Sequence, residues 1–538
     1  MTRRQRLSLA LLMPVTLLLV GMLGAGLAQP VPDSPVISDS PQVNPARIIS
    51  DTQTLAALAP ERGVGSPGNA IARDWIIEQF KAMSLTVETL PFAVTVASQE
   101  RPGAQVWVTA PGTSDDILLI SARYDTPIVN SNSDNGYPAE GLATLLELAR
   151  VLSTPPSSHQ HTFLFMASDS VVYGPSWGAK TFLEQFPSRR QIIAVVDIDD
   201  RPPHSNLAGL WNGYAPLWLR QLKQSVFSAA DVAGATEFFY RALPFQTGDA
   251  ALYLRAGLPA IYVNSSHAPA IETLLRTIDT IDPLPTDSVN APYWRISETH
   301  YLSNWVTPLL QLLLFAPLFV FTAIAYRKDR PREEELRPEF TAFMAWAVVG
   351  VDGYAIAFSL VAARLLPQYE LFPAAPGDPF LLQPTGWAAL AIYGTMAFMV
   401  WHTFWGWRGS GGWGRFADRL NIPHRQTTLL ILLSGLALVT WFVNGFAAVV
   451  VFGLPAYLWP WIEPHRSLPG KIINTALALM GLLPLFFGLI LVFGDPAFGP
   501  WWWFFPLGAA HGFFPLTTVI GFILFVALSI RFLRHGWR

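Results

Sequence analysis

Three apolar runs between residues 117 and 199 alternate with two segments of helical pattern. The runs read ILLISARYDT, HTFLFMASDS and QIIAVVDIDD, and they are rich in β-branched residues. This order predicts a β-α-β-α-β unit with parallel strands and crossover helices. Each run ends in a polar cluster, namely Arg123-Tyr124-Asp125, Ser168-Asp169-Ser170 and Asp197-Ile198-Asp199. Because parallel strands open their ligand crevice at their carboxyl ends, we expect these ionisable groups along one rim.

The flanking patterns extend this α/β region in both directions. A helix is predicted from Ser66-Pro67, and two extended runs, LTVETLPFAVTV and AQVWVTA, follow it. Residues 215–232 are predicted to be helical, and GLPAIYVN is predicted to be a further buried strand. His159 and His161, just ahead of the second run, are expected to be solvated loop residues.

From Tyr301 onward the pattern becomes that of membrane-spanning helices. The fourth apolar segment is too long for one span and has the turn dipeptide Asn444-Gly445 at its middle. A hairpin there is favoured over a single span, because it returns the basic C-terminus to the side of the other basic loops. The candidate segments are Leu302–Tyr326, Phe340–Ala363, Trp387–Trp407, Thr427–Trp461, Ile472–Phe493 and Phe513–Leu533.

The N-terminus predicts a further span. A short basic start precedes Leu7–Ala28, which carries no charge, so the N-terminus is expected in the cytoplasm and the next domain outside it. An uncleaved signal anchor is favoured over cleavage after Ala28. The expected organisation is an anchor (1–28), a Pro- and Ser-rich linker (29–45), an extracytoplasmic α/β domain (46–291) and an all-α polytopic membrane domain (292–538) of six or, preferably, seven helices.

Composition narrows the partners. The chain is 51% hydrophobic and 14% charged, with a mean hydropathy of +0.34 and a formal net charge of -3. We therefore expect membrane lipid and a peptide or protein ligand in the crevice as partners, and no nucleic acid; the oligomeric state stays open. The chain has no cysteine, which excludes disulfides and thiolate metal sites. These features favour the plasma membrane of a bacterium.

The α/β region resembles the zinc-dependent aminopeptidases of metallopeptidase family 28 (clan MH). The resemblance covers about Arg62 to Leu284 and is carried by the strand-end clusters, by SDNG at 133–136, GSPGN at 65–69, AGLPAIYV at 256–263 and DTID at 279–282. It implies an aminopeptidase-like, three-layer α/β/α domain with a mostly parallel central sheet. The layout of the whole chain is similar to that of the GPI-transamidase membrane subunit and of membrane-bound family-28 peptidases of the endoplasmic reticulum.

The resemblance also assigns the zinc site, and this chain departs from it. The family's first histidine ligand falls on Arg123, its second glutamate on Ser170, and its last histidine on or near Leu275. The two aspartate ligands are retained as Asp134 and Asp199. A catalytic zinc normally takes three protein ligands, and an arginine stays protonated in proteins. The resemblance therefore implies a degenerate zinc site and no resident cofactor, with zinc expected only if the chain is an active peptidase.

Three further residues complete the predicted site. Asp169 stands at the general-base position, where a shorter carboxylate replaces the family's glutamate. Asp125, which orients the histidine ligand in the family, is expected to pair with Arg123 or its neighbours. Arg123 itself is expected to lie between Asp134 and Asp199 in place of the metal, because two facing carboxylates would otherwise repel each other.

Three functions stay open at this point. The favoured one is a membrane-anchored pseudopeptidase that binds or scaffolds. The alternative is an active zinc exopeptidase that uses Asp134, Asp169, Asp199 and a histidine from elsewhere. The third is a lipid- or transport-linked membrane protein that depends on Asp352, which lies near the middle of Phe340–Ala363. Asp352 fits a lipid-headgroup or proton site and a helix-packing role equally well.

Overall fold

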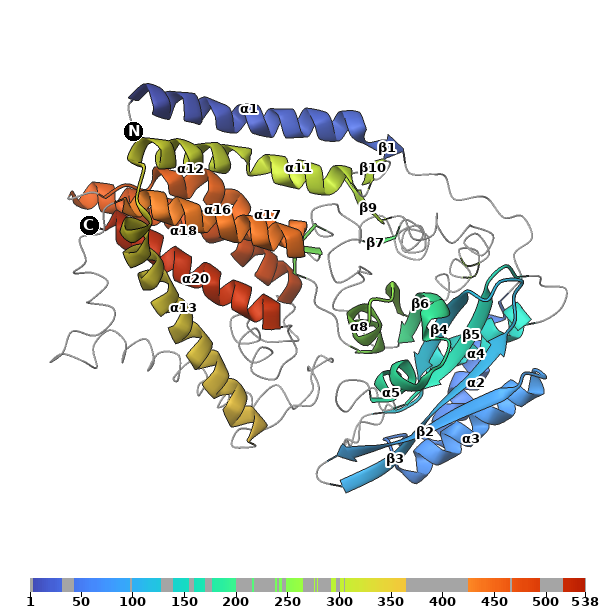
Figure 1. Cartoon of the computed structure of the whole chain (residues 1–538). Helices are drawn as coiled ribbons and strands as arrows, with labels where there is room; N and C mark the ends of the chain where they lie inside the picture. The colour runs from blue at the N-terminus through green and yellow to red at the C-terminus, as the bar shows by residue number, and fades with distance from the viewer. Residues whose placement is uncertain are drawn as a thin grey trace. The chain divides into compact units, whose positions relative to one another are not determined.

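In the computed structural model the chain forms two compact units, which divide at Ala28/Gln29 and at Asn304/Trp305 (Figure 1). The described residues are 3–30, 43–96, 99–126, 139–153, 159–169, 177–199, 248–264, 292–296, 300–303, 305–363, 424–464, 467–493 and 516–537, with a few short stretches between 215 and 278.

One of the two units is an α/β unit, which is built on a six-stranded sheet in the order β2-β3-β5-β4-β6-β8. Strands β5, β4, β6 and β8 are parallel to one another, and β3 pairs antiparallel with both β5 and β2. The predicted β-α-β-α-β unit is confirmed as β4-α4-β5-α5-β6. The strands are β2 (Val87–Val96), β3 (Gln99–Ala110), β4 (Ile117–Arg123), β5 (Thr162–Ser168), β6 (Ile192–Asp199) and β8 (Ala260–Asn264).

Helices cover both faces of this sheet (Figure 1). On one face, apolar side chains of α2 (Pro45–Leu58), α3 (Pro67–Ala82) and α4 (Glu140–Ser153) pack in one core. On the other face, α5 (Trp177–Gln185) and α8 (Gly248–Arg255) pack in a second core. The mixed α/β fold class expected from the sequence is therefore present.

Two expectations about histidines are wrong. His159 and His161 are both buried, at 9% and 1% exposure. His159 Nε2 lies 2.6 Å from the carbonyl oxygen of Leu152, in the last turn of α4, and its ring packs edge-on against Phe163. The imidazole of His159 therefore interacts with a carbonyl group at the C-terminal end of α4.

A small second sheet, in the order β1-β10-β9-β7, contains residues that the sequence pattern placed elsewhere. β1 (Gln29–Pro30), at the start of the predicted linker, pairs with β10 (His300–Ser303), which pairs with β9 (Pro292–Arg295). β7 (Ala215–Pro216) occupies the start of the predicted helix 215–232 and pairs with β9. The rest of that predicted helix lies outside the described residues.

The second unit is helical. Within the described residues it has four helices long and apolar enough to cross a membrane, or five if the bent pair α11–α12 is one span. That pair, predicted as one continuous helix, bends by 43° near Phe315 and Pro317. The segment Trp387–Trp407 lies outside the described residues. The helices are α1 (Arg3–Leu27), α11 (Val306–Leu314), α12 (Ala316–Asp329), α13 (Glu333–Ala362), α16 (Arg425–Val443), α17 (Gly445–Leu458), α18 (Leu468–Phe493) and α20 (Leu516–Gly536).

The turn predicted at Asn444-Gly445 is present. The Asn444 side chain accepts hydrogen bonds from the first backbone amides of α17. Gln426, at the start of α16, donates a hydrogen bond of 3.1 Å to the carbonyl of Pro460, just beyond the end of α17. The two helices therefore form an antiparallel hairpin. Trp459, at the C-terminal end of α17, is buried and stacks on Phe525 of α20, with 5.7 Å between the ring centroids.

Buried charges join three helices at one end of this unit, which we call the charged end (Glu339, Arg425 and Arg531). Arg531 of α20 donates two hydrogen bonds of 2.7 Å to the carboxylate of Glu339 on α13. Arg425 of α16 lies 2.9 Å from the same carboxylate. Glu339 and Arg531 are both fully buried, so their charges compensate each other away from water.

We expect Glu339→Gln to destabilise the helical unit by about 3–5 kcal/mol, because it leaves buried guanidinium groups without their carboxylate. Glu333→Gln is the matched control on the same helix. Glu333 is 89% exposed and lies 3.9 Å from the exposed Arg337, so its loss should change the free energy of unfolding by less than about 0.5 kcal/mol. Thermal unfolding of the full chain in detergent measures both, and equal effects would contradict the expectation.

Candidate active site

The polar side chains at the carboxyl ends of β4, β5 and β6 divide between the two faces of the sheet. Side chains alternate along a strand, so consecutive polar residues point to opposite faces. Asp169, just after β5, interacts with α3, whereas Ser168, one residue earlier, interacts with α8 on the other face. The rim predicted from the sequence therefore forms two separate polar clusters.

The first cluster surrounds Asp169, whose side chain is fully buried. Asn69 of α3 donates a hydrogen bond of 3.0 Å to Oδ1, and the backbone N–H of Ala104 in β3 donates one of 3.0 Å to Oδ2. The Tyr124 hydroxyl lies 3.1 Å from Oδ2. A Cβ added at Gly103 would lie 2.9 Å from Oδ2, which shows how closely the carboxylate is enclosed.

Local sequence explains this geometry. Ser66 caps α3 by accepting a hydrogen bond from the backbone N–H of Asn69, and Pro67 occupies the first turn. The side-chain amide of Asn69 donates both to Asp169 and to the carbonyl of Arg62. The GSPGN segment therefore places a polar side chain of the first helical turn on the end of β5.

Burial, and after it the nearby Asp125 carboxylate, raise the pKa of Asp169 to about 7 against the opposing effect of the hydrogen bonds with Ala104, Asn69 and Tyr124. The hydrogen bonds of Tyr124 fit a protonated Asp169. Its hydroxyl has one proton and lies 2.7 Å from the carbonyl oxygen of Ala104. When the Tyr124 hydroxyl donates its hydrogen bond to the Ala104 carbonyl, its oxygen can accept a hydrogen bond from a protonated Asp169.

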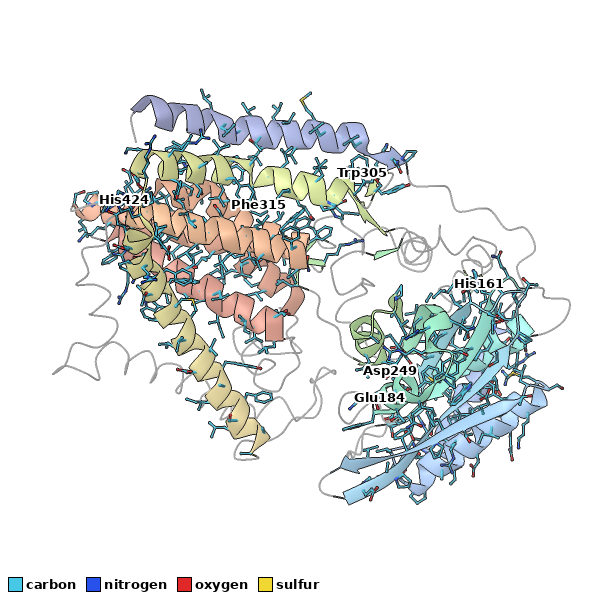
Figure 2. All side chains as sticks on the ribbon, in the orientation of Figure 1. His161, Glu184, Asp249, Trp305, Phe315 and His424 are labelled. Carbon is cyan, nitrogen blue, oxygen red and sulfur yellow. The ribbon has the colours of Figure 1, made fainter. Side chains whose placement is uncertain are left out.

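The second cluster lies on the other face and contains two buried aspartates. The Ser121 hydroxyl of β4 donates a hydrogen bond of 3.0 Å to Asp197 of β6. The Ser168 hydroxyl of β5 donates one of 2.5 Å to Asp249, which projects from the first turn of α8 toward the sheet (Figure 2). The pKa of Tyr253, next to both aspartates, is raised well above its usual value by burial and then by these two charges.

The remaining predicted site residues fall in three groups. Arg123 is buried at the end of β4, in register with Ser168, and Asp125 is buried beside the Asp169 cluster. Leu275 is fully buried in the first hydrophobic core, where it cannot hold a metal. The side chain of Asp199 lies outside the described residues, as do Asp134 and Ser170; Asp199 itself ends β6.

Sequence reasoning placed Asp197 only among the rim residues and gave no role to Asp249 and Ser121. A signal for two of them exists: Ser121 and Asp197 interrupt otherwise apolar strands, and strand pairing places them opposite each other. Asp249 offers no comparable signal, because an acidic residue in the first turn of a helix is an ordinary feature. Among the residues the structure describes, no three His, Asp or Glu side chains converge as a metal site.

The Asp169 cluster predicts a pH dependence. A carboxyl whose pKa is about 7 when folded and 3.8 otherwise binds more protons in the folded state between these values. The free energy of unfolding of the α/β unit should therefore fall as pH rises from about 4 to about 7, by up to about 1.4 kcal/mol per pH unit. Above about pH 7 it should level off. Asp169→Asn should remove this slope, because an amide does not titrate.

Because the chain has no cysteine, a single introduced thiol can report unfolding of the α/β unit. A single Ala167→Cys substitution in the buried β5 reports unfolding of the α/β unit in the full chain through its reaction with a thiol reagent in urea, corrected for the thiolate fraction. Asp115→Asn, at an exposed position, is the control and should keep the slope. The same slope with and without Asp169 would contradict the assignment.

The α/β unit is the part of the chain that is similar to a known protein family. Residues 105–295 match the model of Peptidase family M28. No curated protein matches the chain. Among solved structures, a glutaminyl cyclase from an Acidobacteriales bacterium is 18% identical, with a TM-score of 0.36 over 47% of this chain and 99% of that one.

Two peptidase structures are similar at the same level. A Zn-dependent exopeptidase from Parabacteroides distasonis is 13% identical, with a TM-score of 0.32 over 46% of this chain and 100% of that one. A leucine aminopeptidase precursor from Bacteroides thetaiotaomicron is 10% identical, with a TM-score of 0.33 over 46% of this chain and 100% of that one. Identities and TM-scores this low carry no information on activity.

Proposed function

The chain contains a Peptidase family M28 domain, at residues 105–295, and a C-terminal region of long apolar helices, and from this premise we propose that it is a membrane-anchored pseudopeptidase. Its α/β unit binds a peptide or protein at the strand-end crevice and does not hydrolyse it. The proposal rests on one observation above all: the carboxylate at the general-base position, Asp169, is fully buried among hydrogen-bond donors.

A general base must reach the proton that it removes, directly or through one water. Asp169 is engaged by Asn69, by the backbone of Ala104 and by Tyr124, and it has no exposed surface. Its raised pKa also keeps a large share of it protonated near neutral pH. Both properties suit a structural carboxyl that holds α3, β3 and β4 to the end of β5.

The ligand positions point in the same direction. Leu275 is part of the core, and Arg123 is a buried cation where the family has a histidine ligand. A guanidinium repels a metal ion and cannot donate a lone pair to it. The residues present therefore do not fit a catalytic zinc, which weakens the alternative of an active exopeptidase built on Asp134, Asp169, Asp199 and a histidine.

Polar groups buried near the carboxyl ends of the strands support the binding part of the proposal. Arg123 supplies a planar set of donors for carbonyl or carboxylate oxygens, and the Asp197–Asp249 cluster supplies negative charge on the same face of the sheet. A binding module needs such convergent polar groups and no activated water. The Arg123 position between Asp134 and Asp199 is part of this proposal.

The membrane placement is also part of the proposal. The N-terminal helix α1 packs along α11 and α12, and a Cβ added at Gly24 would lie 3.6 Å from Leu310. Such packing supports an anchor that stays attached, with the N-terminus in the cytoplasm and the α/β unit outside it. A bacterial plasma membrane is the proposed location.

Hydrolysis of aminoacyl anilides by the full chain in detergent, supplied with zinc, tests the proposal. We expect turnover no higher than that of Asp169→Asn, because no activated water is available. Asp115→Asn, exposed and outside the site, serves as the matched control. Turnover in the wild type and the control that disappears in Asp169→Asn would overturn the pseudopeptidase and establish Asp169 as a working base.

A further inference from the structure

The outward face of α13 carries a carboxylate in the middle of an apolar helix. α13 is the least covered of the four long apolar helices in the described part of the chain. Only 22% of its apolar window is buried, against 33%, 33% and 44% in the other three. In Figure 1 it diverges from α16 and α20 toward its C-terminal end. Among the described residues, none therefore covers one side of this helix along much of its length.

Helix geometry shows which side Asp352 occupies. α13 crosses α20 closely at Gly350, where an added Cβ would lie 2.5 Å from Ile523. Asp352 follows two residues later and is rotated by about 200°, so it lies on the opposite side of the helix. Its side chain is exposed, within a stripe of exposed apolar residues: Met344, Val348, Val351 and Ile356.

Asp352 is also far from the charged end. Glu339 is thirteen positions earlier, which corresponds to roughly 20 Å along the helix axis. At that distance Asp352 lies deep in the candidate span, where a carboxylate is costly and normally pairs with another group. The charges at the charged end therefore cannot compensate it.

The other described spans offer no cation at this depth. Every Lys and Arg of the described helices α12, α16, α18 and α20 lies near a helix end. Arg531, the one farthest into its helix, is already bound to Glu339. A second copy of the described helices would bring another carboxylate to Asp352 and no matching positive charge.

We propose that the face of α13 around Asp352 is a docking surface for a transmembrane helix of another protein that carries a lysine or arginine near its middle. The apolar stripe supplies the packing surface, and Asp352 supplies the charge that selects the partner. This inference rests on the membrane placement proposed above and is independent of whether the α/β unit is catalytic.

The test uses the full chain in phosphatidylcholine vesicles with a fluorescent leucine- and alanine-based transmembrane peptide that has one central lysine. Energy transfer measures association. We expect the wild type to bind this peptide about tenfold more tightly than the same peptide with a central leucine. Asp352→Asn should lose that preference, and Asp352→Lys should transfer it to a peptide with a central glutamate. Val348→Leu, on the same face, should leave it unchanged.

Two results would overturn the docking surface. One is equal binding of the lysine peptide by the wild type and by Asp352→Asn. The other is a set of crosslinks from a photocrosslinker at Val351 that join this position only to residues of the same chain or of a second copy. Either pattern would show that the face is already covered. Flotation of the vesicles separates the two proposals: a chain that fails to float contradicts the membrane placement itself, whereas an embedded chain that ignores the lysine peptide contradicts docking alone.

Discussion

The burial of Asp169 is the constraint on which the account of the α/β unit depends. A carboxyl group at the end of a central strand has either to face water and a metal or to be satisfied inside the protein. Here two donors, from α3 and β3, and the Tyr124 hydroxyl just after β4 satisfy it. The same hydrogen bonds that hold these elements together remove the side chain from the crevice. In the proposed pseudopeptidase, the stability of this site and the loss of the catalytic role therefore have one physical cause.

The helical unit shows the same principle with full charges. Glu339 is buried between two arginines, and this arrangement ties α13, α16 and α20 together at the charged end. A buried ion cluster of this kind contributes little net stability compared with an apolar core, but it strongly penalises other arrangements of the helices. Asp352, on the uncovered side of the same helix, lacks such compensation among the described residues, and this contrast gives it its proposed role in docking.

Much of the fold could be predicted from sequence periodicity. The alternation of apolar runs and helical segments gave the β4-α4-β5-α5-β6 unit, and the Asn444-Gly445 dipeptide gave the turn between α16 and α17. Failures occurred where a local pattern was overruled by tertiary contacts. His159 lies in a segment that the sequence predicts to be a solvated loop, yet its side chain is buried and interacts with a carbonyl at the end of α4. Gln29 and Pro30 have linker character, yet they pair with β10.

The candidate site was less predictable than the fold, because strand alternation separates residues that are adjacent in sequence. Ser168 and Asp169 were read as one cluster, but they point to opposite faces and take different partners. Asp249 comes from a helix eighty-one positions beyond Ser168 and joins it only through the fold. Family resemblance located the strand ends correctly, but it could not show that Asp169 is enclosed.

Zinc content of the full-length protein tests the central claim most directly. The chain is purified in detergent without chelator, offered zinc, freed of unbound metal and assayed for zinc per chain. We predict a value near zero, because Leu275 lies in the core, Asp169 is buried and Arg123 stands where the family resemblance expects a ligand. A stoichiometric zinc that is lost on Asp134→Ala would contradict the account and restore the metallopeptidase.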